Sequence, residues 1–401
     1  MYVATLVGCI LPAVQGREGV AGVSADGEAW VAAMPPPPPP PPPKGWNITM
    51  AQSRAPWHLS MASSNTTIKA FPTNYHYNQT AGLGVDIYVV DSGINVNHVD
   101  FGGRARWGYV APGYQQADGL GHGTHVAGLA ASKSWGMAKQ ANLVAVKVIS
   151  DGGSGLVSDI VGGIQWSISE AIKNRKKFGT RSVINLSMGT APNAGLDRMV
   201  LHALRCDIPV VVAGGNTGLN GKAQSPGRVK AALTVGATTK DYKLWAQSAT
   251  SPGLDLVAPG VNIPSTWITS STATAFLSGS SMSAPLISGL VAYHLSLYPL
   301  LPVKRVNKRL KLKSSKIISS PSLTNVGLLF NCWDVNCYPP INITKPANVT
   351  APPANITMPA NITMPANVTM TVNMTTTTTT MMEITTTTET PVTTPPPDPP
   401  A

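Results

Sequence analysis

Four polar side chains of complementary chemistry stand at the ends of apolar segments in this 401-residue chain. Asp91 comes directly after the run VDIYVV, and Asn216 follows the run IPVVVAG. His122 lies between two glycines in GLGHGTHVAG, where a helix is expected to begin, and Ser281 lies in SGSSMSAP, before an apolar helix. Packing alone does not call for a carboxylate, an imidazole, a hydroxyl and a carboxamide at four such ends. We therefore interpret them as one functional set.

These four side chains suit nucleophilic attack on a carbonyl carbon. A serine hydroxyl is a weak nucleophile and requires a base, and histidine titrates near neutrality. A buried carboxylate holds such a histidine in one tautomer and stabilises its imidazolium form. A carboxamide donates to the oxyanion of the tetrahedral intermediate, together with the N–H of the serine. Ser281 alone also has a simpler interpretation, because serine is a common helix N-cap.

The segment that carries Ser281 predicts a buried helix. Leucines 286, 290 and 297, with other aliphatic residues, recur at three- and four-residue steps over 277–298, which leaves little polar face. Proline is tolerated only in the first turn of a helix, so Pro285 predicts a helix start within a few residues of Ser281.

The central region alternates apolar, β-branched runs with helical patterns. Near-continuous apolar runs indicate strands that are covered on both faces, and alternation with helices indicates an α/β fold with a doubly wound, mostly parallel sheet flanked by helices on both faces. Sites in such folds lie at the carboxyl ends of the strands. The expected strands are 85–90, 142–149, 182–187, 208–214, 232–237 and 254–258, and the expected helices are 122–134, 157–177 and 194–206.

Composition divides the chain into four parts. Residues 1–15 resemble a signal peptide without a basic start, and 16–54 form a Pro-rich segment, expected to be disordered, with nine consecutive prolines. Residues 55–335 have globular composition and are long enough for one domain. Residues 339–401 are rich in Thr, Pro and Asn, and too poor in large apolar residues to pack.

The tail also carries a cluster of glycosylation acceptors. Six Asn-x-Thr sequons occur within about thirty residues and precede a Thr/Pro tract, a pattern typical of a glycosylated stalk. We therefore expect a secreted, extracellular protein, associated with the cell wall through this tail. An unmodified low-complexity tail is the alternative. The acceptors are Asn342, Asn348, Asn355, Asn361, Asn367 and Asn373.

The net charge of +11 is concentrated in one segment. Seven Lys or Arg and no acid fall within 301–316. Such a run can contact nucleic acid or anionic lipid, but it is more often a solvated helix face. No aromatic stacking residue accompanies it, so we expect no nucleic-acid partner. The apolar helix that follows Ser281 contains Ser, His and Pro, so we expect no transmembrane segment.

The motifs DSG, GHGTHVAG, AGGN and SGSSMSAP, in the order Asp, His, Asn, Ser, resemble those of subtilisin-like serine proteases, and the proteinase K branch in particular. The resemblance extends from about residue 55 to Asn331. It implies a subtilisin-like fold with Asp91 as the orienting carboxylate, His122 as base and acid, Ser281 as nucleophile and Asn216 as oxyanion donor. Ser280 replaces the usual threonine before the nucleophile and keeps a hydroxyl.

The resemblance also implies how a substrate lies. Two edges hold an extended peptide as an added strand, and a third segment lines an open pocket for the residue before the scissile bond, with broad, apolar preference. The edges are Gly153-Ser154-Gly155 and Ser187-Met188-Gly189, and the pocket segment is Ala213-Gly214-Gly215. Proteins and peptides are the expected partners of a monomeric serine endopeptidase.

No cofactor is expected to be required. Asp255 lies where one branch of the family has a structural calcium carboxylate, and an aspartate that merely supports the start of a strand is the alternative. The family's N-terminal inhibitor domain is not recognisable before residue 55. A second function therefore remains open, namely a catalytically silent surface glycoprotein that keeps the fold.

Overall fold

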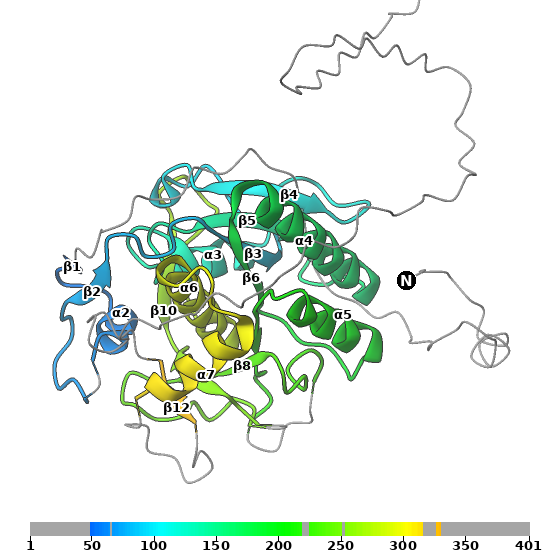
Figure 1. Ribbon diagram of the computed structural model, residues 1–401. Coiled ribbons are helices and arrows are strands. Elements are labelled where there is room, and N and C mark those ends of the chain that lie inside the picture. Colours follow the sequence, from blue (N-terminus) through cyan, green and yellow to red (C-terminus); the bar gives the residue numbers. More distant parts are fainter. Residues whose placement is uncertain (1–48, 65, 219–223, 251–252, 316–325, 330–401) are drawn as a thin grey trace, which may run out of the picture. The chain divides into compact units, whose positions relative to one another are not determined.

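The computed structural model describes residues 49–64, 66–218, 224–250, 253–315 and 326–329, all of which fall in the first of two compact units, residues 1–341 (Figure 1). The expected signal peptide at 1–15, most of the Pro-rich segment and the tail at 339–401 with its sequons lie outside the described residues.

An eight-stranded sheet forms the centre of the described chain, and every neighbouring pair of its strands is parallel. The order β12-β9-β8-β7-β6-β3-β5-β4 confirms the doubly wound fold expected from the alternating pattern. The strands are β3 (Val85–Asp91), β4 (Ala105–Val110), β5 (Asn142–Lys147), β6 (Arg181–Leu186), β7 (Val210–Ala213), β8 (Leu233–Thr238), β9 (Leu256–Pro259) and β12 (Gly327–Leu328).

Helices cover both faces of this sheet (Figure 1). Successive side chains of a strand point to opposite faces, and those of β3 separate accordingly. Ile87 and Val89 pack in one core with α3 (His122–Ala131) and α6 (Ser280–Leu297). Tyr88 and Val90 pack in the other with α4 (Val157–Phe178) and α5 (Ala194–Arg205). All seven residues of β3 are buried, which explains its near-continuous apolar pattern, interrupted by the buried Asp86.

Helix α6 begins at Ser280, close to the expected start, but Pro285 is its sixth residue and not part of the first turn. That placement is a correction with a local cause. Proline has no N–H to donate to the carbonyl four residues earlier, which is that of Ser281. The Ser187 hydroxyl donates to this carbonyl instead, at 2.9 Å, so the helix tolerates the proline.

Several elements were not predicted. Residues 49–52, assigned to the disordered N-terminal segment, form β1 (Thr49–Gln52), which pairs antiparallel with β2 (Tyr75–Asn78). β10 (Ile263–Thr266) and β11 (Thr274–Leu277) form a hairpin, and β4 was also missed. Strands of four residues carry little periodic signal, even where exposed and half-buried residues alternate, as in β11.

Short and peripheral helices complete the fold. They are α2 (Trp57–Ala62), the 3-10 helix η2 (Val99–Phe101) and α7 (Val303–Lys313). The last of these contains most of the basic run and buries Val303, Val306 and Leu310. None of the described helices is long and apolar enough to cross a membrane.

Candidate active site

The first two predicted side chains are in contact. Asp91 is the last residue of β3, and His122 is the first residue of α3. The His122 Nδ1–H donates to Asp91 Oδ1 at 2.7 Å, and the Ser92 N–H donates to the same oxygen at 2.8 Å. The Asp91 side chain is fully buried, whereas that of His122 is 25% exposed. The carboxylate therefore holds the ring from inside, and the ring stays accessible to a substrate.

Asp118, a second buried carboxylate that the sequence did not reveal as functional, holds the start of α3. Its Oδ1 accepts from the Ser92 hydroxyl and the Gly121 N–H, both at 2.8 Å. Its Oδ2 accepts from the N–H and the hydroxyl of Thr124, at 2.9 and 2.5 Å. These contacts join the residue after Asp91 to the residues on both sides of His122. The backbone around the imidazole is thereby fixed.

Burial and charge act in opposite directions on His122. Burial lowers the pKa of the imidazole, but the charge and hydrogen bond of Asp91, helped by the charge of Asp118, outweigh it and raise the pKa above its usual 6.5. Burial raises the pKa of Asp118 above its usual value, although its four donors act in the opposite direction. Because all four contacts donate to Asp118, they favour its ionised form.

Ser281 lies beside the carboxyl end of β6. Its hydroxyl donates to the Ser187 carbonyl at 3.0 Å, and the Ser187 hydroxyl donates back to the Ser281 carbonyl. Ser281 is half-buried, so its hydroxyl is open on one side. Among the described residues no hydrogen bond joins Ser281 to His122, and this resting hydroxyl points to the backbone of residue 187.

Close packing of α3 on α6 sets the relative level of His122 and Ser281. A side chain at Gly289 would collide with the Ala130 carbonyl, so the two helix backbones touch there. That contact lies eight residues beyond His122 in α3 and eight residues beyond Ser281 in α6. Both helices begin at the carboxyl edge of the sheet, so their first residues lie at the same level.

Asn216 is oriented by Ser280. Asn216 Oδ1 accepts from the Ser280 N–H at 2.9 Å and from its hydroxyl at 3.0 Å. The same hydroxyl accepts from the Gly215 N–H at 3.0 Å. With Oδ1 occupied twice, the Nδ2 amino group is the end of the carboxamide left to donate, as an oxyanion donor must. Asn216 is exposed, so a substrate can reach it.

Sheet order brings these contacts together. Strands β3, β6 and β7 are neighbours, and their carboxyl ends carry Asp91, Ser187 and the segment that leads to Asn216. The start of α6 contacts the last two of these ends. The four predicted residues therefore gather along one edge of the sheet, as expected for a doubly wound fold.

The second predicted edge and the predicted pocket segment approach the same side chain, that of Gln224. A side chain added at Gly189 or at Gly215 would each lie 2.9 Å from the Gln224 Oε1. The glycines of the two segments thus lie next to the same amide oxygen. Gln224 was not predicted to contribute to the site, because it follows no strand and belongs to no recognisable motif.

The first predicted edge is a tight loop after β5. Ser150 N–H donates to the Ser154 carbonyl at 3.1 Å, and the Ser150 hydroxyl donates to the same carbonyl at 2.8 Å. Gly153 has a φ of 92°, which favours glycine. Gly155 leads into α4, and the exposed Leu156 precedes that helix.

Asp255 is held by this chain's own groups. One carboxylate oxygen accepts from the Thr234 N–H at 2.9 Å, and the other pairs with the Lys311 ammonium. Both contacts tie the residue before β9 to this chain's own groups. Within the described residues, no group of three or more His, Cys, Asp or Glu side chains is placed to hold a metal ion.

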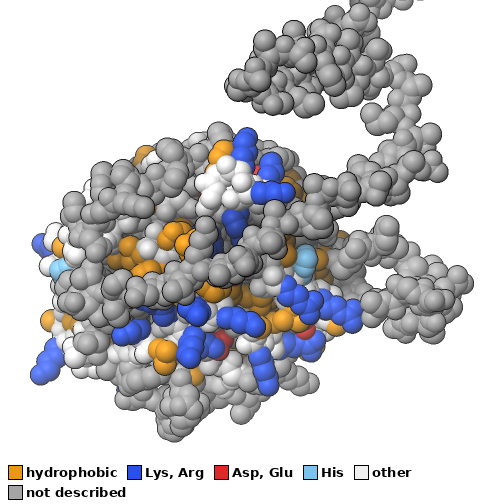
Figure 2. All heavy atoms as spheres, in the orientation of Figure 1, with side chains coloured by type: hydrophobic (Ala, Val, Ile, Leu, Met, Phe, Trp, Pro, Cys, Tyr) orange, Lys and Arg blue, Asp and Glu red, His pale blue; other side chains and the backbone are white. Residues whose placement is uncertain are grey.

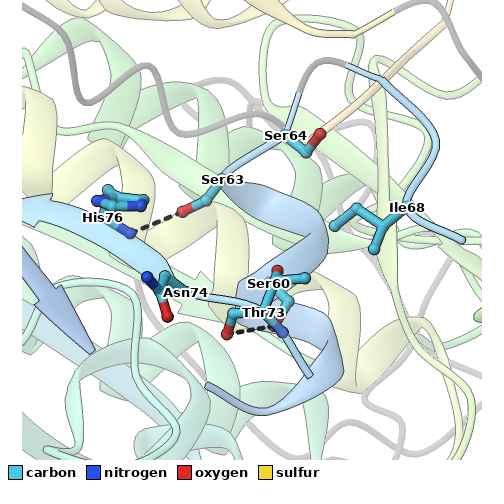
Figure 3. A pocket seen from close by; sticks show the side chains of 7 residues that line it. All are labelled: Ser60, Ser63, Ser64, Ile68, Thr73, Asn74 and His76. Atoms are coloured by element: carbon cyan, nitrogen blue, oxygen red, sulfur yellow. Dashed lines mark hydrogen bonds between the residues drawn. The ribbon is translucent and has the colours of Figure 1, made fainter. Parts of the chain in front are cut away.

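A polar pocket of about 360 Å³ lies apart from these residues, around α2 and β2 (Figure 3). Hydrogen bonds from the Thr73 N–H to the Ser60 hydroxyl and from the His76 N–H to the Ser63 hydroxyl tie its lining together. None of the four predicted catalytic residues lines it. Its lining consists of Ser60, Ser63, Ser64, Ile68, Thr73, Asn74 and His76.

Comparison with known proteins identifies the family. The subtilase family matches residues 82–328, which is more than half of the chain. The chain belongs to the subtilase family. This confirms the resemblance drawn from the motifs around Asp91, His122, Asn216 and Ser281.

Individual subtilases are similar over most of the described chain. The Subtilase-type proteinase psp3 of Schizosaccharomyces pombe is 40% identical over 294 residues, which are 72% of this chain and 65% of that protein. Subtilisin-like protease 8 of Trichophyton verrucosum is 43% identical over 257 residues, 62% of this chain and 52% of that protein. The chain thus spans less than two thirds of the length of these curated relatives.

A solved structure shows the same architecture. A cold-adapted subtilisin-like serine proteinase is 32% identical and superposes with a TM-score of 0.63, covering 69% of this chain and 98% of that one. The shared fold confirms the subtilisin-like architecture expected from the sequence.

Proposed function

We propose that this subtilase is a serine endopeptidase that cleaves peptide bonds through an acyl-enzyme on Ser281. The observation that carries the proposal is the 2.7 Å bond between buried Asp91 and accessible His122, at the same sheet edge as Ser281 and Asn216. The family comparisons support the class of reaction.

The first step requires the Ser281 hydroxyl to change its acceptor. Rotation about χ1 exchanges the Ser187 carbonyl for His122 Nε2, which takes the proton as Oγ attacks the substrate carbonyl. Catalytic hydrogen bonds are often incomplete without a substrate. Asp91 stabilises the imidazolium that forms, and the raised pKa of His122 reflects that stabilisation.

The developing oxyanion is met by two donors on this chain. Asn216 Nδ2 is directed outward because Ser280 occupies Oδ1, and the N–H of Ser281 lies at the start of α6. The imidazolium then gives its proton to the leaving amine. A water activated by the same ring hydrolyses the acyl-enzyme.

Secretion and a broad apolar preference are further parts of the proposal. The sequons of the tail support secretion. For the pocket, small residues at 213–215 and 189 support room for an apolar side chain, and the Gln224 amide oxygen lies next to Gly189 and Gly215.

The deciding experiment combines turnover with active-site labelling. The wild-type chain is expected to hydrolyse casein and to be tagged by a fluorophosphonate on Ser281. Ser281→Ala is expected to lose both, since removing the nucleophile of the related enzyme subtilisin lowers kcat about a millionfold.

A folded wild-type chain that is not tagged would instead support the silent surface glycoprotein. Casein hydrolysis by Ser281→Ala at the wild-type rate would refute the nucleophile. Thermal unfolding of both proteins shows that the comparison is between folded molecules.

A further inference from the structure

Helix α7 lies across the edge of the sheet opposite the catalytic residues. The Val303 N–H donates to Asp207, before β7, at 2.8 Å. Asn307 Nδ2 lies 3.5 Å from the Ala231 carbonyl, before β8, and Lys311 pairs with Asp255, before β9. These anchors are four residues apart, about 6 Å along a helix, and the strands they meet are about 5 Å apart.

With that side of α7 turned to the sheet, its other side faces solvent. Lys304, Arg305 and Lys308 are exposed there, and Leu312 on the same side is 69% exposed. Leu300, in the turn before the helix, is 75% exposed. We call Leu300, Lys304, Arg305, Lys308 and Leu312 the basic face.

Neighbouring helix ends extend the positive charge. Arg175 of α4 donates to the carbonyls of Cys206 and Asp207, which follow α5, so the ends of α4 and α5 meet beside the start of α7. Other cations in this region are exposed, and Figure 2 shows Lys and Arg side chains gathered over and around α7. The exposed cations at the ends of α4 and α5 are Lys176, Lys177 and Arg205, Lys230 is exposed before β8, and Lys173 is paired with Glu170.

The acids in this region are already neutralised. Asp207 pairs with Arg175 and Arg181, and Asp255 pairs with Lys311. No described carboxylate lies within ion-pair distance of Lys304, Arg305 or Lys308. The positive charge of the basic face is therefore available to a partner.

We propose that the basic face docks onto an anionic lipid surface. Cations in a row attract acidic headgroups, and two leucines that stand out among them can enter the boundary between headgroups and acyl chains. Phosphates of a nucleic acid use the cations but gain nothing from exposed leucines, and this face offers no stack of aromatic rings for bases. The two exposed leucines therefore favour a lipid surface over a nucleic acid as the partner.

The test uses the full chain and vesicles of phosphatidylcholine with or without 30% phosphatidylserine, scored by co-sedimentation. Binding is expected only to the anionic vesicles and is expected to weaken with salt. Each cation near such a surface contributes about fivefold in affinity, so Lys304→Gln/Arg305→Gln/Lys308→Gln should weaken binding about a hundredfold. Leu300→Ser/Leu312→Ser should weaken it at least about tenfold at unchanged charge.

A matched control removes three exposed cations elsewhere, in Lys69→Gln/Lys133→Gln/Lys243→Gln, and should bind like the wild type. All variants should keep wild-type peptidase activity, since none touches the catalytic edge. The proposal is overturned if the wild-type chain does not bind anionic vesicles, if the leucine variant binds equally well, or if the control variant is as weak as the α7 variant. Tighter binding to a DNA duplex than to the vesicles would also overturn it.

Discussion

Ser280, the residue before the nucleophile, orients the oxyanion donor Asn216. Its hydroxyl accepts from Gly215 N–H and donates to Asn216 Oδ1, so one small side chain fixes which end of the carboxamide faces the substrate. The sequence showed only that a hydroxyl was kept at this position. The hydrogen bonds that give it a role depend on the ends of β7 and α6 meeting, which no local pattern records.

Removing that hydroxyl should weaken the oxyanion donor without removing it. We predict that Ser280→Ala lowers kcat about tenfold with little change in KM, since loss of the donor itself costs about 10²–10³-fold. Steady-state kinetics on a peptide anilide measures this. Ser280→Thr, which keeps the hydroxyl, should stay within about twofold of wild type, and an equal loss in both variants would contradict the interpretation.

Asp118 supports His122 both through charge and through the backbone. Its charge contributes to the raised pKa of the imidazole, so Asp118→Asn should lower that pKa. Because activity requires neutral His122, the acidic limb of kcat/KM should lie above pH 6.5 in the wild type and move to lower pH in the variant. If the acidic limb of the pH profile stays at the same pH in the variant and only its thermal midpoint of unfolding falls, the role of Asp118 is purely structural.

Long, buried strands were predictable from the sequence, whereas the edge strand β4 and the short hairpin strands were not. Strands β3, β5, β6 and β8 were placed from their apolar runs to within two residues at each end, because both faces of each are covered. β4 was missed because its polar and aromatic residues, such as Arg106 and Trp107, dilute the pattern. The hairpin β10–β11 was missed because each strand has only four residues, too few for the alternation in β11 to be recognised in the sequence.

The packing of α3 on α6 makes a prediction of its own. An alanine side chain at Gly289 would meet the Ala130 carbonyl and the Met137 side chain, so Gly289→Ala should destabilise the protein by about 1–3 kcal/mol. Urea unfolding of the Ser281→Ala background, which avoids self-digestion, measures this. Gly162→Ala in α4 meets only the end of the Tyr109 side chain and should be near neutral. Equal effects at both glycines would argue against a close helix contact.

For the whole molecule, buried histidines predict sensitivity to acid. Burial lowers the pKa of His58 to about 4, and of His125 and His294 to about 3, against 6.5 when exposed. Between these values the unfolded chain binds more protons than the folded one, so stability falls as the pH falls from about 6.5 to about 4. Each histidine should contribute about 2–3 kcal/mol of this loss by pH 4.5.

This loss of stability is measurable as the decrease in the urea midpoint from pH 7 to pH 4.5, again in the Ser281→Ala background. His58→Asn removes one of the three groups and should flatten the pH dependence by about a third, whatever it does to stability at pH 7. A variant curve parallel to that of the parent protein would contradict the assignment. The prediction required burial of the rings, which the sequence analysis indicated only for His294, through its place in the buried helix expected over 277–298.

The parallel sheet separates the basic face of α7, at one of its edges, from the catalytic residues at the opposite edge. Strands β7, β8 and β9 start where α7 crosses the sheet, and β3, β6 and β7 end at the catalytic residues, so attachment through one edge leaves the other facing outward. A molecule anchored at a bilayer would therefore present its cutting side to dissolved polypeptides in the surrounding fluid. Proteins embedded in the layer beneath it would stay out of reach.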